Sequence, residues 1–452
     1  MTPDGCFAAK AAPMRITLPH PLVLLLGAVA IAALLTWVIP AGSYERRLDP
    51  GTGREVVVAG TYAPIKSTPV GPMATLMAVP RGIISGADVV LTVVFVGGAF
   101  ALLEATGALS RLIGALVGHP RRPKVVLVVV SLLFATLGAL ENTQEELVAL
   151  VPVLVVLSRG LGFGSVTALA MSLGAAGVGA AFGPTNPFQT GIALRFADVQ
   201  GLSQPALRFG LFAVAVPVWI AWTLAMASCD DVRPLVTVEQ GARPTRRDLV
   251  MLALVLLPFL PYVYGVLRFD WGFNELSAIF LVVGFAVGLV DGRGLSGTAA
   301  GFLKGMEALL AAGLFIGIAR AISVVLTEGQ VLDTILYAMA APLANVPGVL
   351  AGILMVPIQA LLHVPVPTTS GQAVLSMPVM APLADLVGIS RDAAVIAYQT
   401  GAGLLDPITP TNGAVLAILM GAQVSYGRWL RFAVPGLLLV ALVGVAGIVL
   451  AG

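Results

Sequence analysis

Apolar runs about as long as a bilayer is thick make up most of this chain. A helix needs about 20 apolar residues to cross the hydrocarbon core of a membrane. Only 11% of the 452 residues are charged, against about a quarter in soluble domains. The sequence therefore predicts an all-α polytopic membrane protein that sits in the lipid bilayer. Nine runs are long enough to cross: 21–40, 87–107, 164–195, 207–227, 248–266, 276–291, 304–326, 391–420 and 428–450.

Two further apolar regions are each interrupted by a polar tip. Residues 124–158 contain "ENTQEE", and residues 346–385 contain "PVPTTSGQ". Backbone that turns at membrane depth is tolerated only where protein or a water-filled cavity covers it. We therefore expect two re-entrant hairpins. The alternative is that the first arm of each is a full span followed by a polar loop.

The basic residues predict how the chain is oriented. Lys10 and Arg15 precede the first run, which is too long for a signal peptide and is expected to be retained. With residues 1–20 in the cytoplasm and both hairpins re-entrant, most of the 25 Lys and Arg fall on the cytoplasmic side. This topology gives about nine transmembrane helices, and the two hairpins enter from opposite sides of the membrane.

One offset of 226 residues relates the two halves of the chain. It places Pro152 on Pro378, Gly162 on Gly388, and the tripeptide Pro-Thr-Asn at 184–186 on the same tripeptide at 410–412. In this topology the copies have opposite orientations, and inverted repeats with paired broken helices are typical of secondary transporters. The expected organisation is a first repeat over 21–227 with hairpin 124–158 and broken helix 164–195, a cytoplasmic linker and connecting helix over 228–275, and a second repeat over 276–452 with hairpin 346–385 and broken helix 391–420.

The repeated tripeptide lies inside apolar runs, as "FGPTNPF" and "ITPTNGA". Proline removes a backbone donor and clashes with the preceding turn, so each motif should break its helix. Freed carbonyls suit a cation, and the N-terminus of the following half-helix suits an anion. Thr185, Asn186, Thr411 and Asn412 add polar groups without burying charge. The alternative interpretation is a packing kink.

Three stretches resemble a known family. "PHPLVLLLGAVAIAALLTWVIPAGSYER", "GAAFGPTNPFQTGIAL" and "PTTSGQAVLSMPVMAPLADLVGISRDAAVIAYQTG" are similar to YfcC/DcuC-type carriers of the ion transporter superfamily. The resemblance implies a bacterial inner-membrane carrier, dimeric, in which a scaffold and a mobile transport domain work as an elevator. It implies that substrate and coupling cations bind at the hairpin tips and breaks. The tip residues are Asn142, Thr143, Thr369 and Ser370, although the tips here depart from the symmetric Ser-Asn-Thr pattern of the superfamily.

Ionisable residues at membrane depth are functional hypotheses by default. Glu145 at the first tip and Asp406 before the second break are expected to couple cations, with solvation of the tip and a helix cap as their alternatives. For His363 we expect a structural hydrogen bond to a carbonyl rather than a proton relay. For Arg320 and Glu104 we expect an ion pair or snorkelling, and an anion contact from Arg320 is the less favoured interpretation.

The sequence thus predicts a secondary active transporter of a small carboxylate-bearing solute, either a dicarboxylate or an amino acid. Coupling to Na⁺, coupling to H⁺ and exchange all stay open, and the alternative is a channel or pore for small anions. Three histidines without ligand spacing and no recognisable nucleophile–base pair argue against an enzyme, a cofactor or a metal site other than a coupling Na⁺. A net charge of +2 gives no reason to expect a nucleic-acid partner.

Overall fold

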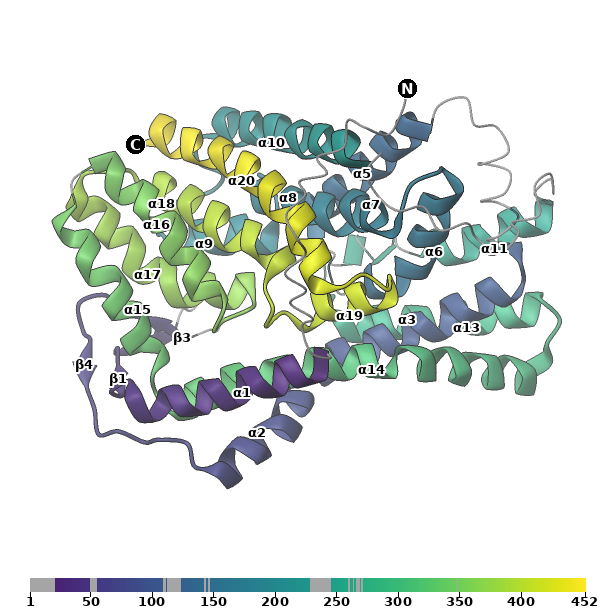
Figure 1. Ribbon diagram of the computed structural model, residues 1–452, viewed down its shortest axis with the longest axis horizontal. Helices are drawn as coiled ribbons and strands as arrows, with labels where there is room; N and C mark the ends of the chain where they lie inside the picture. The colour runs from purple at the N-terminus through teal and green to yellow at the C-terminus, as the bar shows by residue number, and fades with distance from the viewer. Residues whose placement is uncertain are drawn as a thin grey trace, which may run out of the picture.

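The computed structural model is built almost entirely of helices (Figure 1). It describes residues 21–48, 55–108, 111, 123–141, 144, 147–227, 245–258, 261–262, 264–265, 269, 271–346 and 348–452. Within this part of the chain, seven helices are long and apolar enough to cross a membrane: Ala87–Ala105, Pro123–Leu140, Ser165–Phe196, Pro205–Met226, Phe273–Val290, Gly294–Glu328 and Tyr426–Ala451. Leu22–Val38 and Gly348–His363 are shorter apolar helices.

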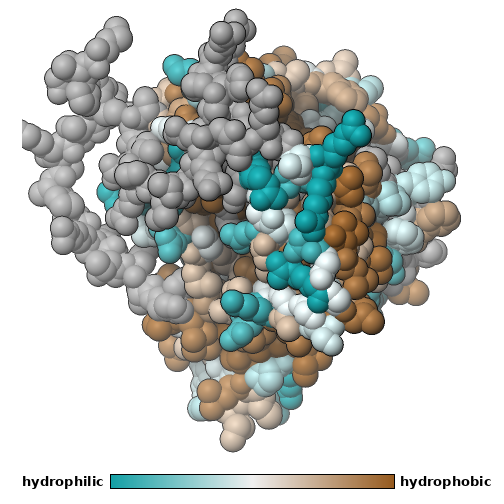
Figure 2. All heavy atoms as spheres, turned by 90° about the vertical axis from the view of Figure 1, so that its right-hand side faces the viewer, coloured by the Kyte–Doolittle hydropathy of each residue, from teal (hydrophilic) through white to brown (hydrophobic). Residues whose placement is uncertain are grey.

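The longest helix organises one side of the molecule, which we call the α14 bundle. It consists of α14 (Gly294–Glu328) and the helices packed along it, which are α1 (Pro21–Val38), α2 (Pro72–Ser85), α3 (Ala87–Ala105) and α13 (Phe273–Val290). Figure 1 shows α1 and α14 side by side along its lower edge. Apolar side chains cover much of the described surface at the end of this bundle (Figure 2), as expected for a lipid-facing helix bundle.

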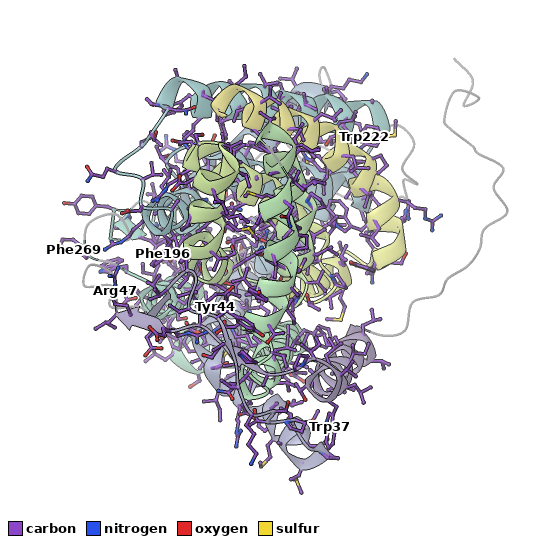
Figure 3. All side chains as sticks on the ribbon, turned by 90° about the vertical axis from the view of Figure 1, so that its left-hand side faces the viewer. Trp37, Tyr44, Arg47, Phe196, Trp222 and Phe269 are labelled. Atoms are coloured by element: carbon purple, nitrogen blue, oxygen red, sulfur yellow. The ribbon has the colours of Figure 1, made fainter. Side chains whose placement is uncertain are left out.

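Residues 41–86 connect the first two predicted spans, and the described part of this stretch forms elements of its own. It contains two short antiparallel pairs of strands, and α2 follows them. Arg46 pairs with Asp333 at 2.9 Å and ties these strands to the second half of the chain. Burial, with the Asp333 carboxylate as a second cause, raises the pKa of Tyr44 to about 12, so its phenol stays neutral. Figure 3 labels this side chain. The strands are β1 (Gly42–Ser43) with β4 (Ala63–Pro64) and β2 (Arg46–Leu48) with β3 (Glu55–Val57), and Asp333 lies on α15 (Leu332–Ala340).

The first interrupted helix, broken helix 1 (Ser165–Phe196), is buried over its first part, residues 166–184. Its backbone is interrupted between Phe182 and Pro187, where prolines bracket the polar residues. The first arm of the preceding region, α5, packs against it through glycines. A Cβ at Gly179 would overlap the carbonyl oxygen of Ala135 on α5, so only glycine permits this approach. The elements are α5 (Pro123–Glu141), α6 (Leu147–Gly160), α7 (Ser165–Leu169), η1 (Ala170–Gly174), α8 (Ala175–Phe182), η2 (Pro187–Gly191) and α9 (Ile192–Phe196).

The second interrupted helix, broken helix 2, has the same plan. A π-helical turn precedes its interruption, and the arm α16 approaches it so closely that a Cβ at Gly401 would overlap the Val356 carbonyl oxygen. Tyr398 on this helix donates to the carbonyl of Thr369 at 2.6 Å. The elements are η4 (Ala341–Asn345), α16 (Gly348–His363), α17 (Thr369–Val387), α18 (Arg391–Tyr398), η5 (Gln399–Gly403), η6 (Asp406–Ile408) and α19 (Gly413–Gly421).

A buried ion pair fixes broken helix 2 to α10 (Pro205–Met226), which packs on α20 (Tyr426–Ala451). Arg208, only 2% exposed, donates to Asp392 at 2.6 Å and to the side-chain oxygen of Gln399 at 2.9 Å. Gln399 in turn donates to Thr190 on broken helix 1. The two interrupted helices are thus joined through charged and amide groups as well as through apolar packing.

The expected span 248–266 is not continuous. Helix α11 (Arg246–Leu256) ends at Leu256 and is followed by a turn. Its start is set locally, because Thr245 and Asp248 form a reciprocal capping box. The apolar composition of this stretch therefore does not produce one spanning helix within the described residues.

Candidate functional site

A cavity of about 820 Å³ lies between the α14 bundle and broken helix 2. Residues of α14 line it, and so do residues of the start of α17 and of the interruption before α19. Seven polar residues of the hairpin tips and of that interruption line it: Gln144, Thr368, Thr369, Ser370, Asp406, Thr411 and Asn412. Five of these seven are residues that the sequence singled out, and the structure brings them together.

Asn412 is the centre of the polar network in this cavity. Its side-chain oxygen accepts hydrogen bonds from the backbone nitrogens of Ala414 and Val415, so it is the N-cap of α19. Its amide nitrogen donates to Asp406 at 2.8 Å and to Gln144 at 3.1 Å. One side chain therefore joins the first tip, the second interruption and the following half-helix.

His363 is fully buried behind Asp406. Its Nε2 lies 2.9 Å from the Asp406 carboxylate, and its Nδ1 lies 2.8 Å from the side-chain oxygen of Gln372. The expected hydrogen bond to a carbonyl is present, because the Gln372 oxygen is the carbonyl of a side-chain amide, and the second ring nitrogen contacts a carboxyl group. The amide nitrogen of Gln372 donates to the backbone oxygen of Gln359, so its oxygen must face His363 and accept a proton from Nδ1. A hydrogen bond between Nε2 and the Asp406 carboxyl group needs one further proton, which either of these two groups can carry.

Asp406 is not the cap of the second half-helix. That role belongs to Asn412, while the Asp406 carboxyl group contacts His363 and accepts a hydrogen bond from Asn412. Thr411 donates to the carbonyl of Val364 at 2.7 Å and so ties the interruption to the end of α16.

Next to the first interruption only Phe188 lines this cavity, and the polar residues of that interruption do not. Asn186 is 0% exposed, caps η2 through the backbone nitrogens of Phe188 and Gln189, and donates to the carbonyl of Gly138 at 2.8 Å. Thr185 is exposed and does not line the cavity either. Asn186 and Asn412 therefore have the same local geometry at the 226-residue offset but different surroundings.

Arg320 lines the cavity from α14 and donates to the carbonyl of Ser85 at 2.7 Å. The expected ion pair with a buried carboxylate is not formed within the described residues. Glu104 is exposed near the end of α3 and does not line the cavity. The less favoured sequence interpretation, in which Arg320 faces a ligand site, fits its position.

Three predicted tip residues, Asn142, Thr143 and Glu145, lie outside the described residues. The sequence prediction also omitted one residue that lines the cavity and one that joins α10 to broken helix 2. Gln144 aligns with Ser370 at the 226-residue offset, which was a sufficient signal to include it in the site. Arg208 is an arginine within an apolar run, and this alone marks it for attention. Nothing local indicates the pairing of His363 with Gln372.

Apolar spanning helices around a polar cavity, with interrupted helices in its wall, are the features of a membrane transport protein. The family comparison agrees with this class. The model of DcuC, the C4-dicarboxylate anaerobic carrier family, matches residues 18–452, and the chain belongs to this family.

Two curated relatives match nearly the whole chain. An "Uncharacterized protein" of Haemophilus influenzae is 28% identical over 489 residues, which cover 94% of this chain and 95% of the relative. The "Putative basic amino acid antiporter YfcC" of Escherichia coli K12 is 27% identical over 471 residues, covering 92% and 93%. Among solved structures, the YdaH transporter of Alcanivorax borkumensis matches with a TM-score of 0.47 and 16% identity, covering 95% of this chain and 98% of that one.

Proposed function

We propose that this chain is a secondary active transporter of a small carboxylate-bearing organic solute, a dicarboxylate or an amino acid, bound in the cavity beside Asn412. The observation that carries the proposal is that one cavity is lined by both hairpin tips, by the second interruption and by α14. Its volume of about 820 Å³ is that of a ligand pocket, which in proteins measures about 300–1,000 Å³.

The walls of the cavity favour an anionic group. The N-terminal residues of two helices, α17 and α19, line it, and backbone N–H groups at helix N-termini attract negative charge. The amide nitrogen of Gln144 is buried there and has no hydrogen-bond partner in the described residues. A buried donor of this kind costs free energy unless a ligand or water accepts from it. A carboxylate can accept a hydrogen bond from the Gln144 amide and is favoured by the positive ends of the two helices.

The family and the named relative point to solutes that share this group. C4-dicarboxylates and amino acids differ in charge, yet both carry a carboxylate. The proposal therefore takes the carboxylate as the common recognition element. Energy coupling is left to Na⁺, H⁺ or exchange, with Asp406 and its neighbour His363 as the groups that respond to the cation.

We also propose that the two halves are inverted repeats and that the α14 bundle is the scaffold of a dimeric, elevator-type carrier. The identical capping of a half-helix by Asn186 and Asn412, 226 residues apart, supports the repeat. The proposed location is the bacterial inner membrane with a cytoplasmic N-terminus, so that a cysteine introduced at Ser203 should react only from the periplasm.

Transport in reconstituted liposomes tests the proposal. The purified protein should catalyse saturable uptake of labelled succinate or aspartate and counterflow of the same solute. The matching thermal-shift screen pairs each solute with and without Na⁺, because a ligand that binds only the folded state stabilises it. Ion conductance without counterflow would establish a channel instead, and chemical turnover of the solute would establish an enzyme.

A further inference from the structure

Among the described residues that line the cavity, one is basic, and it is Arg320. The two acidic residues in the lining are already engaged, since Glu328 pairs with Arg81 and Asp406 contacts His363. Arg320 has no carboxylate partner within the described residues. A cation at membrane depth is costly unless it is paired or faces a polar cavity. This side chain therefore presents uncompensated positive charge to the cavity.

The Arg320 side chain packs against the break between α2 and α3. The Nη1 atom of Arg320 donates to the carbonyl of Ser85, the last residue of α2, at 2.7 Å. Carbonyls at the end of a helix lack internal partners and attract cations. A Cβ at Gly86 would lie 2.8 Å from Cδ and 3.0 Å from Nε of Arg320. Only glycine at position 86 leaves room for the arginine stem in this position.

The bond to Ser85 occupies one nitrogen of the guanidinium. The group carries five N–H donors in a planar fork that matches a carboxylate with two parallel hydrogen bonds. Arg320 contacts Ser85 and Gly86 on one side, and it lines the same cavity as the start of α17 and the start of α19. The guanidinium and the two helix N-termini are thus positive features of one cavity.

We propose that Arg320 binds a carboxylate of the transported solute, and that Gly86 positions it by leaving space for its stem. The inference rests on the proposed function and deepens it by naming the residue that selects for the anionic group. Arg320 contacts the substrate in this proposal, whereas Gly86 acts through Arg320 and is a positioning residue.

A double-mutant cycle on purified full-length protein tests both roles. Binding of succinate and of its monoamide succinamate is measured, together with aspartate and asparagine as a second pair that differs by one carboxylate. Arg320→Gln should weaken succinate or aspartate binding by about 10–100-fold, the effect of losing hydrogen bonds to a charged group. The preference for the acid over its amide should fall by a similar factor. Arg320→Lys keeps the charge but loses the planar pair of donors, so its affinity and its acid-over-amide preference should lie between those of the wild type and of Arg320→Gln.

Gly86→Ala should weaken binding of the same solutes in the wild-type background and have no further effect in Arg320→Gln, because the two residues act as one unit. Gly210→Ala is the matched control, since a Cβ there meets nothing within 4 Å. Unchanged acid-over-amide preference in Arg320→Gln, or an equal effect of Gly86→Ala in both backgrounds, would overturn the inference. If the wild-type protein binds neither acid, the proposed function itself fails. If Arg320→Gln does not fold, the acid-over-amide preference is measured in Arg320→Lys instead, and an unchanged preference there would overturn the inference.

Discussion

Asn186 and Asn412 provide a controlled comparison, because the same residue caps a half-helix in two different environments. Replacing either with alanine removes a side-chain cap, which costs about 1 kcal/mol. At Asn186 the substitution also leaves the buried carbonyl of Gly138 without its partner at 2.8 Å, and an unsatisfied buried group costs about 1–3 kcal/mol. The expected loss of folding free energy for Asn186→Ala is therefore about 2–4 kcal/mol.

The loss of stability at Asn412 should be smaller and the loss of function larger. Its amide nitrogen bonds Asp406 and Gln144, both of which line the cavity, so water can replace these bonds. The expected cost for Asn412→Ala is about 1–2 kcal/mol from the cap and the residual desolvation. Because Asn412 itself lines the cavity, transport and ligand binding should be abolished or reduced by a large factor.

Two measurements on the same preparations separate these outcomes. The apparent melting temperature in detergent should fall further for Asn186→Ala, and the ligand-induced rise in melting temperature should vanish only for Asn412→Ala. Asn186→Asp and Asn412→Asp, which keep the capping oxygen, should recover part of the stability. A ligand response that survives Asn412→Ala but is lost in a folded Asn186→Ala would refute the assignment of the cavity as the binding site.

Three further outcomes follow from the contacts. Arg208→Leu leaves Asp392 buried without its cation and should cost about 3–5 kcal/mol; the melting temperature should recover in part when Asp392→Asn is added. Gly179→Val places side-chain atoms against the Ala135 carbonyl and should lower membrane abundance and melting temperature, whereas Gly210→Ala should not. Asp406→Asn should abolish accumulation driven by the coupling cation while solute exchange in liposomes persists; unchanged accumulation would reduce Asp406 to a structural residue.

The position of each interruption is encoded locally. Pro184 and Pro187 bracket the first, Pro407 precedes the second and Pro410 lies within it, so a few residues specify where backbone donors are lost. The capping role of each asparagine is likewise local, because the hydrogen bonds run to nitrogens two or three residues ahead. The sequence also indicated a membrane protein and the family, since composition and motif spacing need no tertiary information.

Only the tertiary structure decided which polar groups share a cavity. Asn186 and Asn412 have the same sequence context, yet one contacts a buried arm and the other faces the cavity, because this depends on what packs beside them. Arg320 and the Ser85 carbonyl are 235 residues apart, and no periodicity brings them together. An apolar run specifies that a segment enters the bilayer. It does not specify which face of that helix meets another helix, because lipid is equally favourable on every face. The close approach of glycines and the satisfaction of buried polar groups therefore determined which faces of the helices meet.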